Sequence, residues 1–159
     1  MVPGLNGAGV RRRLKQDLHR VNRGKSRMIR IPKAIYEKII SHAMREQPLE
    51  CCGILGGRDH TVEKAFELMN EEKSTTRYFM SPRDQLRVFE EMEKESMEMI
   101  AIYHSHPQTI PFPSETDVKL AFYPDVSSII ISLKEGENPV IKAFQIREEA
   151  IYLEEIEVL

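Results

Sequence analysis

The sequence predicts one domain that contains both helices and strands, and three observations support this prediction. The 159-residue chain is 41% hydrophobic and 30% charged, which is typical of a single domain that buries its own core. Apolar residues recur at helical spacing in residues 33–46 and again after Ser81,. Residues 99–106, 126–133 and 140–158 instead form the apolar or alternating runs of strands,. No apolar run approaches the roughly 18–20 residues of a membrane span.

The first 27 residues differ in charge from the rest of the chain. They hold eight basic residues and one acidic residue, Asp17, which leaves 15 basic and 24 acidic residues and a net charge of −9 for the remainder. We expect residues 1–27 to form a basic, disordered extension and residues 28–159 to form the domain. The extension could bind nucleic acid or fold back onto the acidic domain. An over-extended gene start or a vector-derived leader explains it equally well, so nucleic-acid binding is disfavoured.

The domain is expected to begin with a short strand and a helix. Met28 to Pro32 alternates Ile with Arg30, as a strand does,. The helix is predicted over Lys33 to Glu46, because apolar residues spaced four apart give it one face to bury,.

Two further strands are predicted around a pair of glycines. Cys52 to Leu55 is a short strand, Gly56 and Gly57 turn the chain, and Thr61 to Leu68 returns as the second strand,. Glu50 stands at the start of the first of these strands. The adjacent Cys51 and Cys52 are the only cysteines, too few for a secreted disulfide framework, so a reducing cytoplasm is expected.

The next helix has a clear start signal. Ser81 supplies a capping hydroxyl and Pro82 suits the first helical position,. Leu86, Phe89 and Met92 are expected to form its buried face. Tyr78 to Met80 before it is interpreted as another short strand.

The remaining elements begin with a strand over Met99 to His106, followed by a loop that holds three prolines. A short helix is predicted from Ser114 to about Phe122. An inner strand should follow over Val126 to Leu133, and a closing antiparallel pair is expected over 140–146 and 150–158.

A candidate metal site lies where the strand over Met99 to His106 ends. Successive strand residues point to opposite faces, so His104 and His106 share a face and can reach one ion together, with Asp117 completing the set. Two imidazoles and a carboxylate are a typical ligand set for hydrolytic zinc, which leaves its fourth position for water. Ser114 and Asp117 also match a helix capping box. Both roles can coexist if one carboxylate oxygen accepts an amide while the other binds metal.

Glu50 is the best candidate for the general base, because partial burial beside an apolar strand would raise the pKa of its carboxyl group. A serine nucleophile is disfavoured, since it would leave one of the paired histidines without a role. A catalytic Cys51 or Cys52 is also disfavoured, because a small thiol within a strand usually packs in the core.

These residues resemble the motif of the JAMM (MPN-plus) metalloproteases. That motif is a Glu upstream of His-Ser/Thr-His, then seven residues, a Ser, two residues and an Asp. The corresponding residues here are Glu50, His104, His106, Ser114 and Asp117, with no departure in spacing. The resemblance implies that both histidines and Asp117 bind zinc. It also implies that Glu50 is the general acid/base acting on metal-activated water, and that Ser114 stabilises the oxyanion.

The resemblance covers the chain from about Met28 and is closest to short, stand-alone prokaryotic members. It implies an α/β fold with a mixed, curved sheet flanked by helices, similar to cytidine deaminase. It also implies a zinc hydrolase of peptide or isopeptide bonds at the C-terminal tail of sulfur-carrier or ubiquitin-like proteins. The alternative is a non-catalytic protein-interaction scaffold of the same fold. The oligomeric state stays open, with a dimer as one option.

Overall fold

The computed structural model describes residues 27–159. The predicted basic extension, residues 1–27, lies outside the described residues except for Arg27. Within the described part of the chain, seven strands and three helices follow one another in this order: β1 (Met28–Ile31), α2 (Lys33–Glu46), β2 (Cys52–Arg58), β3 (Thr61–Leu68), α3 (Pro82–Lys94), β4 (Glu98–His106), α4 (Glu115–Lys119), β5 (Ser127–Ser132), β6 (Val140–Arg147) and β7 (Ala150–Val158).

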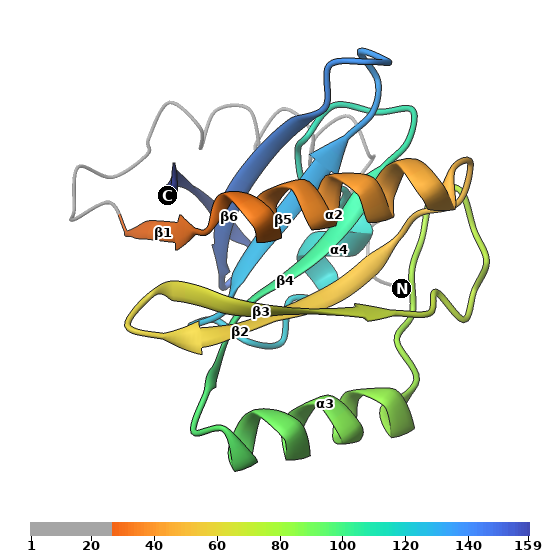
Figure 1. The fold of residues 1–159 in the computed structure, drawn as a ribbon. Coiled ribbons are helices and arrows are strands. Elements are labelled where there is room, and N and C mark those ends of the chain that lie inside the picture. Colours follow the sequence, from red (N-terminus) through yellow and green to blue (C-terminus); the bar gives the residue numbers. More distant parts are fainter. Residues whose placement is uncertain (1–26) are drawn as a thin grey trace.

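The strands form one mixed sheet that curves until it closes (Figure 1). Its order is β1-β3-β2-β4-β5-β6-β7. β1 pairs in parallel with β7 along its length and with β3 through Arg30 and Thr61, which closes the barrel. β4 and β5 are parallel, whereas β2 is antiparallel to both β3 and β4. The predicted α/β fold with a mixed, curved sheet flanked by helices is confirmed.

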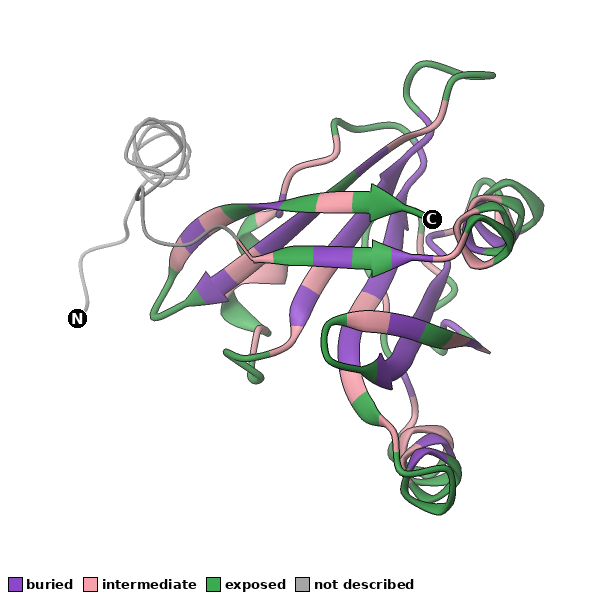
Figure 2. Ribbon diagram, turned by 60° about the vertical axis from the view of Figure 1, so that its left-hand side comes forward, coloured by how far each residue is buried: buried purple, intermediate pink, exposed green. Residues whose placement is uncertain are grey.

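The two longer helices cover different faces of this sheet. α2 buries Ile39 and Ala43 in a core that includes Tyr103 of β4. α3 buries Val88 and Met92 against the other face of β2, β3 and β4. Figure 2 shows both helices outside the buried strands, with exposed residues along their outer sides. Each helix therefore supplies one apolar stripe, as the spacing of its apolar residues predicts.

The chain around α3 differs from the prediction in two details. Ser81 caps α3 as expected, since its hydroxyl accepts the Asp84 amide. However, Leu86 is 57% exposed, because it lies two residues before Val88 and therefore on another side of the helix. Residues 78–80 form an extended loop rather than a strand.

The helix that carries Asp117 is shorter than expected. α4 ends at Lys119, three residues before Phe122. Within residues 27–159, the longest helix has 14 residues, and none is long and apolar enough to cross a membrane.

Candidate metal centre and active site

His104 and His106 lie at the end of β4, one strand of the barrel. β4 is paired on both sides: His104 lies opposite Cys52 of β2 and beside Ile130 of β5. Neighbours on both sides hold the strand in place, and the alternation of side chains directs both imidazoles to one face. His104 is 1% exposed and His106 is 5% exposed.

Asp117 is fixed in the first turn of α4 by a capping box. The Ser114 hydroxyl accepts the Asp117 amide at 3.0 Å, and Asp117 Oδ2 accepts the Ser114 amide at 2.8 Å. The same Oδ2 atom lies 3.2 Å from Nε2 of both histidines. In this structure the oxygen that accepts the cap amide is also the one that faces both imidazoles. The cap places the carboxylate at the site.

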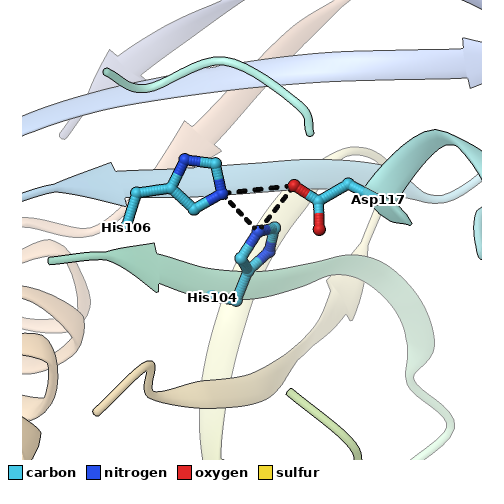
Figure 3. A group of neighbouring side chains, drawn as sticks. All are labelled: His104, His106 and Asp117. Carbon is cyan, nitrogen blue, oxygen red and sulfur yellow. Dashed lines mark hydrogen bonds and ion pairs between the residues drawn. The ribbon is translucent and has the colours of Figure 1, made fainter. Parts of the chain in front are cut away.

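The three side chains bring three potential ligand atoms together (Figure 3). The two Nε2 atoms are 3.1 Å apart, and each is 3.2 Å from Asp117 Oδ2. Ligand atoms bonded to zinc at about 2.0–2.1 Å in a tetrahedron lie about 3.3 Å from one another. The triangle thus has the size of one face of a zinc tetrahedron, and the donor set fits the ion.

The ring orientation of His106 favours metal binding. Its Nδ1–H donates to the carbonyl of Ile110 at 2.9 Å, so the lone pair of neutral His106 lies on Nε2, the atom that faces Asp117. The His104 ring is stacked on Tyr78, with centroids 4.6 Å apart and an interplanar angle of 28°. Among the described residues, His104 Nδ1 has no hydrogen-bond partner.

The charges of the triad support one another. Burial alone would raise the pKa of Asp117, but the histidines and the Ser114 amide outweigh burial and hold that pKa well below its usual range. Burial also opposes the charged form of His106, whereas Asp117 raises the pKa of this imidazole. Asp117 therefore stays an anion, as a carboxylate ligand must.

Glu50 reaches the site from the segment just before β2. The β2–β4 pairing continues past Cys52, because the Ser105 amide donates to the Cys51 carbonyl at 3.1 Å. Extending this register by one more residue places Glu50 opposite His106, on the same face of the sheet. Glu50 is 4% exposed, and burial raises the pKa of its carboxyl group from 4.5 to about 8. Its Oε2 atom is buried and has no partner among the described residues.

The Ser114 hydroxyl and the thiols of Cys51 and Cys52 differ in what they could contribute to catalysis. The Ser114 hydroxyl uses one lone pair for the α4 cap, so its proton remains free to donate a hydrogen bond. Burial raises the pKa of both Cys51 and Cys52 to about 12. Since the thiolate is the nucleophilic form, these buried thiols are poorly suited to catalysis.

A cavity of about 210 Å³ adjoins the triad, and Asp117 is one of its lining residues. Tyr78 and Phe79 line it from the loop before α3, while Leu120 and Phe122 line it from the segment after α4. The stacking of Tyr78 on His104 has no local sequence signal, because these residues are 26 positions apart and meet only through the tertiary fold.

The chain is similar to several known proteins. A family model described as prokaryotic homologues of the JAB domain matches residues 32–147. The chain is 33% identical over 123 residues to a CysO-cysteine peptidase of Mycobacterium tuberculosis, a match that covers 76% of this chain and 84% of that protein. It is 36% identical over 92 residues to a probable TtuB-protein conjugate cleaving protease of Thermus thermophilus, covering 57% of this chain and 62% of that protein.

Solved structures show the same architecture. Protein DSY2949 from Desulfitobacterium hafniense superimposes with a TM-score of 0.76 at 39% sequence identity, covering 83% of this chain and 93% of that one. AF2198, a JAB1/MPN domain protein from Archaeoglobus fulgidus, superimposes with a TM-score of 0.57 at 21% identity, covering 86% of this chain and 100% of that one. The second likeness supports the fold alone.

Proposed function

Because the chain belongs to the family of prokaryotic homologues of the JAB domain, we propose that it is a zinc-dependent hydrolase of peptide or isopeptide bonds. Its substrates are the C-terminal tails of sulfur-carrier or ubiquitin-like proteins. Its family identifies the chain as a JAMM-type metallopeptidase. We further propose which metal it binds, what each site residue does and what the substrate is.

The observation that carries the proposal is the triangle of donor atoms next to a buried glutamate. His104, His106 and Asp117 would hold the ion through Nε2, Nε2 and Oδ2, which lie 3.1–3.2 Å apart. Zinc bound there would polarise the scissile carbonyl and make the attacking water more acidic.

Glu50 and Ser114 supply the proton transfer and the hydrogen bond that hydrolysis requires. The Glu50 carboxylate accepts a proton from the attacking water and then gives it to the leaving amine. Burial raises the pKa of this carboxyl group in the metal-free protein, which makes it a stronger base than an exposed glutamate and suits it to take and return a proton. The Ser114 hydroxyl donates to the oxyanion of the tetrahedral intermediate, because its proton is not used by the α4 cap,.

The first choice of substrate is a sulfur-carrier protein with cysteine or another adduct at its C-terminus. A relative named as a CysO-cysteine peptidase supports this choice. A relative named for cleaving TtuB–protein conjugates supports ubiquitin-like conjugates as the second choice. The prolyl loop, residues 107–113, would form one wall of the site. Cys51 and Cys52 are free thiols, which supports our placement of the reaction in a reducing cytoplasm.

The rival proposal is a scaffold of the same fold that has lost catalysis. Scaffold members lack site residues, whereas all five motif residues stand in this chain. Zinc content separates the two proposals, because a scaffold without metal would bind none at this site.

Cleavage can be tested by incubating the zinc-loaded protein with sulfur-carrier proteins that bear a C-terminal cysteine, and with ubiquitin-like proteins joined to lysine. Intact-mass spectrometry then reads the products. We expect loss of the added group with wild type and at least about a 100-fold slower loss with Glu50→Gln. Cleavage that does not depend on Glu50, or no cleavage of either substrate, would overturn the proposal.

A further inference from the structure

The side chain of Asn70 uses its full hydrogen-bonding capacity beside the candidate active site. Its Nδ2 donates to the carbonyls of Glu50 at 3.0 Å and Arg77 at 2.9 Å. Its Oδ1 accepts the amides of Glu72 and Phe79, both at 3.1 Å. A carboxamide offers two N–H donors and one oxygen with two lone pairs, so all four positions are filled. Flipping the amide would set like against like at every contact, which fixes its orientation.

The sheet register explains why Asn70 lies beside Glu50. Leu68 at the end of β3 pairs with Cys52 at the start of β2, so two residues further along, Asn70 adjoins Glu50. On the other side of Glu50, extending the β2–β4 register by two residues past the Cys52–His104 pair leads to His106, which is also an electrostatic neighbour of Glu50. Glu50 therefore stands between the asparagine and a triad histidine. Asn70 is itself only 8% exposed, so water cannot readily replace its contacts.

The backbone of Glu50 is held on both sides by the loop that Asn70 organises. The Glu50 amide donates to the carbonyl of Ser74 at 2.9 Å, and the Glu50 carbonyl accepts from Asn70. Glu50 lies two residues before β2, and the hydrogen bonds recorded for its amide and carbonyl are these two. They therefore help to determine where its side chain begins. The carboxylate then projects into a buried space, where Oε2 has no partner among the described residues.

The Asn70 side chain also fixes the position of Tyr78, whose ring covers His104. The carbonyl of Arg77 and the amide of Phe79, on either side of Tyr78, both bind the Asn70 side chain. The Tyr78 ring stacks on His104 at 4.6 Å. One side chain thus links the glutamate, the aromatic cover and the loop between them.

We propose that Asn70 is a positioning residue that sets the location of the Glu50 carboxylate for proton transfer. This inference rests on the proposed hydrolysis, because it assigns Asn70 an effect on catalysis that passes through Glu50. None of the four hydrogen bonds of the Asn70 side chain involves His104, His106 or Asp117. Its loss should therefore lower turnover while zinc binding is preserved.

Two variants separate the contacts of Asn70. Asn70→Ala removes all of them, while Asn70→Asp keeps the acceptor for Glu72 and Phe79 but loses both donors. Displacing a reacting group by about 1 Å can cost on the order of 100-fold in rate. We expect kcat to fall about 10-fold to 100-fold in each variant, with one zinc per chain retained. A kcat within twofold of wild type in folded Asn70→Asp would overturn the inference.

A double-mutant cycle shows whether the effect passes through Glu50. In a Glu50→Gln background, assayed under single turnover with excess enzyme, adding Asn70→Asp should cause no further loss, because residues that act as a unit are not additive. A further loss as large as that of the single variant would mean that Asn70 affects catalysis through the overall fold and not through Glu50.

Tyr103→Phe is the matched control. It removes a buried hydrogen bond to His42 on the opposite face of β4, and kcat should stay unchanged.

Amide hydrogen exchange provides a readout that does not need activity. In Asn70→Asp the Glu50 amide should exchange at least about tenfold faster than in wild type, because its loop is no longer tied to the Glu50 carbonyl. Unchanged exchange at Glu50 would contradict the positioning role even if zinc-loaded wild type proved inactive. Failure of the wild-type enzyme to cleave would instead contradict the proposed function, so the two failures are distinguishable.

Discussion

In the zinc-free protein, the stability of Glu50→Gln relative to wild type should increase as pH rises. Burial raises the pKa of this carboxyl group from 4.5 to about 8. In the unfolded chain the group ionises near its ordinary pKa, while in the folded protein it stays protonated until higher pH. Between those pKa values the folded state binds more protons, so wild type loses stability as pH rises and stops losing it above about pH 8,. The Gln variant does not titrate and escapes this loss.

The magnitude follows from the two pKa values. Each pKa unit corresponds to about 1.36 kcal/mol, so two-state linkage from 4.5 to about 8 gives wild type a loss of about 4 kcal/mol between pH 5 and pH 9. Glu50 is 4% exposed, so solvent does little to screen this cost. The Gln amide itself brings an unsatisfied buried donor that costs about 1–3 kcal/mol. That cost does not vary with pH. The quantity to measure is therefore how the difference between the two free energies of unfolding changes with pH.

Urea unfolding of both proteins from pH 5 to pH 9, with a chelator present, measures this slope. The free energy of unfolding of Glu50→Gln minus that of wild type should rise by about 4 kcal/mol over the range. Glu93→Gln is the control, because Glu93 is an exposed residue of α3 whose charge is solvated in both states. A difference that stays flat with pH for Glu50→Gln would refute the claim that burial holds Glu50 protonated.

Three further outcomes are expected. His104→Ala should lower bound zinc, measured by elemental analysis, from one per chain to below about 0.1, because the two remaining donors are too few to hold the ion. Full zinc occupancy in this variant would exclude His104 as a ligand. Ser114→Ala should lower the free energy of unfolding by about 1 kcal/mol through loss of the α4 cap, and Ser81→Ala, which removes the equivalent cap of α3, provides the comparison. Unchanged stability in urea would show that the Ser114 cap contributes nothing. Gly53→Ala should destabilise the fold by about 1–3 kcal/mol, because the added Cβ meets the ring of Tyr103,; stability equal to wild type would contradict that packing.

Much of the fold could be predicted because local patterns agreed with the final packing. The bounds predicted for the helix over Lys33–Glu46 and the strand over Thr61–Leu68 match α2 and β3. The start of α3 was predictable because a capping hydroxyl followed by Pro82 acts locally. The exposure of Leu86 was not, because which side of a helix is buried depends on the surface it packs against.

The candidate site was predictable where sequence spacing determines geometry. His104 and His106 must share a face of a strand, and Ser114 and Asp117 must meet within one helical turn. The contributions of Asn70 and Tyr78 could not be predicted in this way. Their contacts cross from one strand or loop to another, and only the pairing of β2 with β3 and β4 brings them to Glu50 and His104.

The proposed mechanism is tested most directly by measuring cleavage rate as a function of zinc occupancy. Wild type and Glu50→Gln would be stripped of metal, reloaded to known zinc content, and given a sulfur-carrier protein that ends in an added cysteine. The rate of wild type should rise in proportion to occupancy up to one zinc per chain. The rate of Glu50→Gln should stay near zero although it binds the same amount of zinc. A wild-type rate that does not depend on zinc, or a zinc-loaded Glu50→Gln as fast as wild type, would contradict the proposed mechanism.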